Sequence, residues 1–78
     1  MYTMKLYMFD KNERFLEDMM KKENLIKTIE FEQPNSEIEF EVLMESIDYE
    51  GCLYSLYKDG KSLCSGVLTS DSLYDDIM

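Results

Sequence analysis

The chain has 78 residues, of which 45% are hydrophobic, and it carries 17 acidic and 8 basic side chains for a formal net charge of −9. This length predicts one domain over residues 1–78, and the hydrophobic content argues against a disordered chain. No apolar run is long enough to span a bilayer, and no basic segment precedes an apolar one as in a secretory signal. We therefore expect no membrane partner, a cytoplasmic location, and free thiols at Cys52 and Cys64.

The acidic side chains are distributed unevenly along the chain. Residues 1–29 hold five acidic and six basic side chains, whereas residues 30–78 hold twelve acidic and two basic ones. Such a surface repels nucleic acid and attracts basic partners. Solubility alone is the simpler explanation of an acidic surface, and both explanations stay open at this point.

The first third of the chain predicts a strand followed by a helix. Residues 2–9 place apolar and aromatic side chains on both faces, which is typical of a strand in the middle of a sheet. Asp10 is a candidate N-cap, and Glu13 follows three residues later as in a capping box. A helical stripe of apolar side chains then predicts an amphipathic helix over residues 11–23. The stripe comprises Phe15, Leu16, Met19 and Met20.

Residues 29–42 alternate apolar and acidic side chains on both sides of a Pro-Asn pair. Because successive side chains of a strand point to opposite faces, this alternation predicts a β-hairpin with one apolar and one carboxylate face. Its arms are expected over residues 26–32 and about 37–48. The second arm would turn Ile38, Phe40, Val42 and Met44 toward the core. The carboxylate face would carry Glu30, Glu32, Glu37, Glu39 and Glu41.

A second hairpin is predicted around Asp59-Gly60, a pair that favours a two-residue turn. The strands are expected over residues 52–58 and 61–69. A two-residue turn would pair Lys58 with Lys61, and Leu56 with Leu63.

The last residues, 70–78, predict either a short helical turn capped by Ser70 or Ser72, or a frayed end. The complete order is β-α-β-β-β-β. It predicts an α+β fold, with a curved antiparallel sheet of about five strands and one amphipathic helix packed on one face.

The sequence offers little catalytic chemistry. It contains no histidine, the commonest general base and metal ligand, and none of its three glycines lies in a phosphate-binding loop. The glutamate array has the charge for Ca²⁺ or Mg²⁺ but lacks a coordinating loop. We expect no catalytic residue, no metal site and no cofactor, and therefore no enzyme.

On a paired strand face, carboxylates would be ~6.7 Å apart along a strand and ~4.8 Å apart between strands. This charge density is of the same order as one phosphate per ~3.4 Å of each DNA strand. A face of this kind could occupy a surface that normally binds phosphates. Its expected partner-binding residues are Glu30, Glu32, Glu37, Glu39, Glu41, Asp48, Tyr49 and Glu50.

A short acidic chain with the segment Glu37-Ile38-Glu39-Phe40-Glu41 and no catalytic groups resembles the small phage-encoded inhibitors, above all the anti-CRISPR proteins and other DNA mimics. The resemblance implies a non-enzymatic inhibitor in the host cytosol. It would bind the basic surface of a nucleic-acid-binding protein or nuclease complex, such as a CRISPR effector, without binding nucleic acid itself.

The alternative is a structural or regulatory interaction module, such as an oligomer subunit or an antitoxin-like partner. Such a module would use a sheet edge or a tyrosine- and methionine-rich surface, and its acidic face would only be solvated. A homo-oligomer is expected under this alternative.

Overall fold

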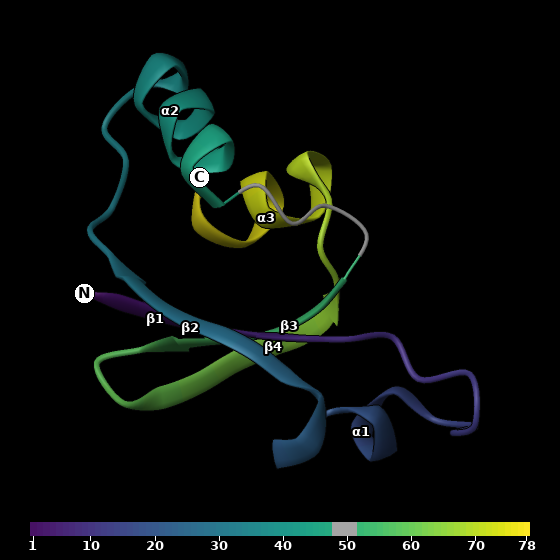
Figure 1. Cartoon of the computed structure of the whole chain (residues 1–78). Coiled ribbons are helices and arrows are strands. Elements are labelled where there is room, and N and C mark those ends of the chain that lie inside the picture. Colours follow the sequence, from purple (N-terminus) through teal and green to yellow (C-terminus); the bar gives the residue numbers. More distant parts are fainter. Residues whose placement is uncertain (48–51) are drawn as a thin grey trace.

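The computed structural model describes residues 1–47 and 52–78 (Figure 1). In chain order its elements are β1 (Tyr2–Tyr7), α1 (Leu16–Met19), the 3₁₀ turn η1 (Lys22–Asn24), β2 (Leu25–Phe31), α2 (Glu37–Ile47), β3 (Leu53–Lys58), β4 (Lys61–Val67) and α3 (Ser70–Ile77). Within the described residues the strands form one antiparallel sheet of four strands in the order β2-β1-β3-β4. The α+β class and the antiparallel sheet are thus confirmed, whereas the five strands and the single helix are not.

Helices α2 and α3 lie together over one face of the sheet, and α1 lies on the other side at one end (Figure 1). The main core fills the space beneath α2 and α3, where Met4, Leu6 and Leu56 of the sheet are fully buried. β1 lies between β2 and β3, which confirms its prediction as a central strand. It ends at Tyr7, two residues earlier than expected.

The helix predicted over residues 11–23 is wrong. α1 spans only four residues. Asp10 and Glu13, the expected capping residues, make other hydrogen bonds. The Asp10 carboxylate accepts a hydrogen bond from the backbone N–H of Asn12 (2.9 Å), which forms a local turn. Glu13 accepts a hydrogen bond from the Lys21 ammonium (3.1 Å) rather than closing a capping box. These local contacts offer the backbone an alternative to a longer helix.

The apolar stripe expected on that helix has little to pack against. Met19 is buried in a small second cluster with Tyr7 and Leu53, on the side of the sheet away from α2 and α3. Phe15 and Leu16 remain 60% and 41% exposed. The sheet face that a long helix would have covered is occupied by α2 and α3 instead.

The hairpin predicted over residues 29–42 is wrong in its second arm, which forms α2. Ser36 begins this helix, because its Oγ accepts a hydrogen bond from the backbone N–H of Glu39 (3.2 Å) and its carbonyl accepts one from Phe40 (3.0 Å). The Glu39 carboxylate reaches back to the backbone N–H of Asn35. This reciprocal arrangement resembles a capping box and stabilises the first turn of a helix.

The side of α2 that faces the sheet has a helical period. Phe40 and Ile47 are buried, and Leu43 and Met44 between them are half-buried. Their spacing of three, four and seven residues is that of one helix face. Ile38 and Val42, which the predicted hairpin would have turned toward the core, are 74% and 61% exposed.

The hairpin turn at Asp59-Gly60 is confirmed. Both residues have positive φ angles, 51° and 84°, as a two-residue turn of this class requires, and Lys58 pairs with Lys61. Beyond the turn a bulge shifts the register, so that Leu56 pairs with Cys64 rather than with the residue before it. The shift turns the Cys64 side chain toward the main core.

The C-terminal residues form a docked helix. Thr69, not Ser70 or Ser72, is the N-cap of α3, and Ser72 completes the capping box with it. Leu73 and Ile77 are buried in the main core. Residues 70–77 are therefore helical, as the first of the two predictions has it, and not frayed.

The Gln33 side chain connects α3 to the sheet. The Gln33 amide accepts a hydrogen bond from the Tyr2 hydroxyl (2.8 Å) and donates one to the carbonyl of Ile77 (2.5 Å). Gln33 lies between β2 and α2, so it joins the start of β1 to the end of α3 across the connection into α2. Tyr54 of β3 adds a second tie, because its hydroxyl donates to Asp76 of α3.

Candidate functional site

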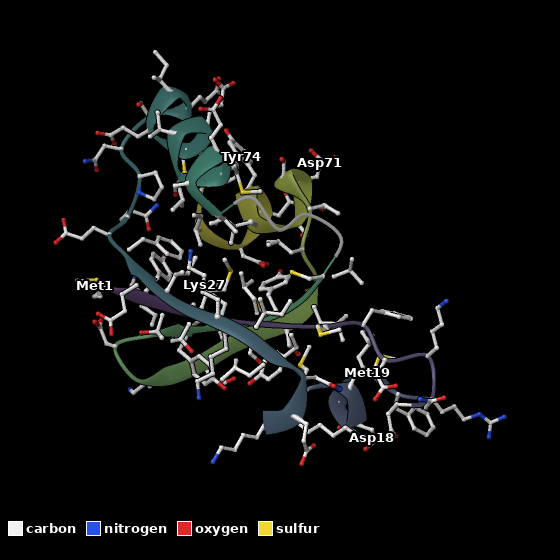
Figure 2. All side chains as sticks on the ribbon, viewed as in Figure 1. Met1, Asp18, Met19, Lys27, Asp71 and Tyr74 are labelled. Carbon is white, nitrogen blue, oxygen red and sulfur yellow. The ribbon has the colours of Figure 1, made fainter. Side chains whose placement is uncertain are left out.

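Helices α2 and α3, which we call the helical layer, carry acidic side chains and no basic one. α2 contains four glutamates and α3 contains three aspartates. All eight Lys and Arg residues lie elsewhere, and outside the helical layer and residues 48–51 they are balanced by eight acidic residues. The labelled Asp71 and Tyr74 lie in this layer, on the side of the sheet opposite to Asp18 and Met19 (Figure 2). The net charge of the described residues is therefore concentrated on one side of the molecule.

The structure divides the predicted carboxylate face between two places. Glu30 pairs with Thr3 across the β1–β2 ladder, so it points away from the helical layer, on the open face of the sheet. Glu37, Glu39 and Glu41 lie on α2. The two-stranded lattice of carboxylates expected from the hairpin is therefore wrong, since its second strand is a helix.

Two further groups of predicted site residues have other positions. Glu32 follows β2 and shares a hollow of about 230 Å³ with Glu39, which also caps α2. Asp48, Tyr49 and Glu50 lie outside the described residues.

A cleft of about 310 Å³ opens between α2 and α3, and we call it the helical cleft. Its lining combines apolar side chains from both helices with carboxylates from both helices. The apolar residues are Phe40, Met44 and Tyr74, and the polar ones are Glu37, Glu41, Ser70 and Asp71. The rings of Phe40 and Tyr74 meet edge to face, with centroids 5.2 Å apart and an interplanar angle of 87°. This contact packs the two helices together and shapes the floor of the cleft.

Three carboxylates line the helical cleft, those of Glu37, Glu41 and Asp71. Glu37 and Glu41 are four residues apart and so share one face of α2, while Asp71 belongs to the first turn of α3. In residues 1–47 and 52–78, no ion pair with a Lys or Arg side chain involves any of these three carboxylates. The Tyr74 hydroxyl donates a hydrogen bond to Glu37 (3.3 Å), and the charge of Glu37 raises the pKa of Tyr74.

The helix dipole can explain the acidic residues at the start of each helix but not those near its end. Glu37 and Asp71 lie in first turns, where the helix dipole stabilises a negative charge. Glu45 and Asp75 lie near the C-terminal ends, where a negative charge is unfavourable, and neither helix has a basic residue in its last turn. Helix stability therefore does not account for the charge at the C-terminal ends of this layer.

Sequence reasoning missed the helical cleft because it read residues 37–48 as a strand. Two signals in the sequence indicate the helix: Ser36 and Glu39 have capping-box spacing, and the apolar residues from Phe40 to Ile47 follow a period near 3.6. Once residues 37–47 form a helix, α2 packs beside α3, and Asp71 and Tyr74 of α3 line the cleft between them.

Searches with protein-family models, against curated proteins and against solved structures found no match to this chain. No group of three or more potential metal ligands gathers within residues 1–47 and 52–78. None of the described helices has the length and apolar character needed to cross a bilayer.

Proposed function

We propose that this chain is a non-enzymatic protein-binding module whose helical layer binds the basic surface of a nucleic-acid-handling protein, in the place of phosphate groups. The observation that carries the proposal is the charge of the helical layer, seven acidic and no basic side chains, on a molecule whose other described residues are balanced. A one-sided field of this kind speeds the encounter with a basic partner and orients the two molecules.

The spacing of the glutamates on α2 supports a phosphate-like role. Glu37, Glu41 and Glu45 follow one another at intervals of four residues, which places them ~6 Å apart along the helix axis. Phosphates follow one another at ~3.4 Å of axis along each strand of duplex DNA, so this row approximates every second phosphate. Lys and Arg side chains arranged to bind a phosphate backbone could therefore bind this row.

Occupation of such a surface would exclude nucleic acid from it, and the module would act as an inhibitor. In this proposal the target is a nuclease complex of the CRISPR-effector type, met in the host cytosol by a phage-encoded protein. The chain itself would not bind nucleic acid, because its net charge repels phosphates.

The test compares charge reversals on the two sides of the sheet. The first variant combines Glu37→Lys, Glu41→Lys and Glu45→Lys on α2; the matched control combines Glu17→Lys, Asp18→Lys and Glu23→Lys in and near α1. Both change the net charge equally. Each tagged protein is used to capture partners from cells rich in nucleic-acid enzymes, at low and high salt, and captured proteins are challenged with duplex DNA.

We expect the wild-type chain and the control to capture the same nucleic-acid-binding protein at low salt, and to release it at high salt or on addition of DNA. The α2 variant should lose at least about tenfold in affinity, since several charged contacts vanish together. Equal loss in the control, or capture that DNA does not displace, would contradict the proposal.

One observation favours the alternative, a self-associating interaction module. Among the residues that the structure describes, β4 pairs with β3 alone and is therefore an edge strand, and it exposes Leu63 and Val67. Apart from Lys61 at its start it has none of the charges or prolines that usually protect an edge from pairing. A dimer that persists at high salt in sedimentation experiments, and that Val67→Lys disrupts, would support this alternative.

A further inference from the structure

The helical cleft combines an apolar floor with an acidic rim. Its floor is apolar and aromatic: Phe40 is almost fully buried, while Tyr74 remains 38% exposed and lines the cleft. Its rim is anionic on both sides, from Glu41 on α2 and Asp71 on α3. At about 310 Å³ the cleft is at the lower limit of ligand pockets, which suits one or two side chains rather than a large molecule.

The charges exclude most occupants. An anionic group would be repelled by three carboxylates, and a purely apolar group would cover them without supplying a partner. The Lys and Arg residues of this chain do not pair with them within the described structure. The complementary occupant is a cation attached to an apolar stem.

An arginine side chain fits this description better than a lysine side chain. Its planar guanidinium hydrogen-bonds carboxylates through a fork of donors, stacks on an aromatic ring, and is less strongly hydrated than an ammonium. We propose that the helical cleft binds an arginine side chain of the partner protein, with the guanidinium over the Tyr74 ring and against the carboxylates of the rim. This inference rests on the proposed function, because it specifies how the helical layer recognises its basic partner.

The experiment titrates the whole chain with three blocked pentapeptides, acetyl-Gly-Ala-X-Ala-Gly-amide, in which X is arginine, lysine or citrulline. Citrulline keeps the shape of arginine without the charge. Binding is followed by the NMR signals of backbone amides and of the Tyr74 ring, at constant ionic strength.

We expect the arginine peptide to shift signals of α2 and α3 around the cleft and to bind about two- to fivefold more tightly than the lysine peptide, because the planar guanidinium adds stacking and a fork of donors and is less strongly hydrated. The citrulline peptide should cause no shift. Equal binding of arginine and lysine, shifts spread over the whole acidic surface, or no shift in the cleft would each overturn the inference.

Variants of the cleft separate its two contributions. Tyr74→Leu keeps an apolar floor and should remove the preference for arginine over lysine, whereas Glu41→Gln should weaken both cationic peptides. Asp75→Asn is the matched control, because Asp75 lies on α3 but does not line the cleft. An unchanged amide spectrum outside the cleft shows that each variant is folded.

The outcomes separate the inference from the proposed function. If the triple reversal on α2 abolishes partner capture while the peptides show no preference, the proposed function stands and the arginine site is wrong. If the triple reversal leaves capture intact, the proposed function fails whatever the peptides do.

Discussion

The helical layer and the opposite side of the sheet differ in how their acidic and basic side chains are distributed. Beside α1, Lys21 lies 3.7 Å from Asp10 and 3.1 Å from Glu13, so these two carboxylates have a basic neighbour. In the helical layer, seven acids lie together without one. An acidic coat that served only solubility would need no such separation. The net charge of the described residues therefore belongs mainly to one surface.

The same two sides differ in how firmly they are attached to the sheet. The helical layer buries Phe40, Ile47, Leu73 and Ile77 in the main core, whereas α1 buries only Met19 in a small cluster. Apolar burial is the dominant favourable term in folding, so the helical layer has the packing to tolerate repelling carboxylates on its outer surface. Stability and charge are thus carried by different faces of the same helices.

The largest expected effect tests this difference in packing. Leu73→Ala removes a fully buried side chain and should cost about 2–5 kcal/mol, a large part of the stability of a domain of this size. Met19→Ala, on the other side of the sheet, should cost about 2 kcal/mol or less, because its cluster contains only three buried residues. Urea unfolding followed by circular dichroism measures both. A greater loss for Met19→Ala would show that the helical layer is not the more firmly packed side.

A smaller effect tests the charges. Glu45→Lys and Asp75→Lys place cations at the C-terminal ends of α2 and α3, and each should stabilise the fold by about 0.3–1 kcal/mol at low salt. Glu17→Lys, in the first turn of α1, is the control and should give no gain. Urea unfolding at low and high salt should show that the gain shrinks as salt screens it. A gain that salt leaves unchanged would show that charge is not its cause.

The smallest effect is a dependence on pH in the alkaline range. Glu37 raises the pKa of Tyr74 above 10.0, so the folded chain holds this proton more tightly than the unfolded chain. The resulting contribution to stability is complete below about pH 10 and is lost as the pH rises through the folded pKa. Glu37→Gln should lower the pKa of Tyr74 and remove this contribution.

The Tyr74 ring signals in NMR spectra recorded across the alkaline range give this pKa directly. They must be assigned individually, since burial also raises the pKa of Tyr54. The control is Glu30→Gln, which removes a carboxylate on the open face of the sheet. If Glu37→Gln left the Tyr74 titration unchanged, the hydrogen bond between Tyr74 of α3 and Glu37 of α2 would be contradicted.

Features that depend on neighbouring residues in the chain could be predicted from the sequence. Apolar side chains on both faces of residues 2–9 indicated a central strand, of which Tyr2–Tyr7 forms β1, and the prediction of a strand over residues 26–32 matches β2 within about one residue. Asp59-Gly60 specified a turn because both positions need a positive φ. The acidic excess after residue 29 was visible in the sequence, though not the surface on which it would lie.

Tertiary structure decided what those patterns left open. Residues 37–42 alternate as a strand would, yet Phe40, Leu43, Met44 and Ile47 also form a helix stripe, and the stripe prevails because it packs on a sheet face that a strand could not cover. That same choice leaves residues 11–23 on the other side of the sheet, where α1 buries Met19 in the small second cluster. It also brings Glu41 beside Asp71, thirty positions along the chain, and so forms the helical cleft. Local periodicity fixes which side chains share a face of an element, but only packing decides which element forms and which faces meet.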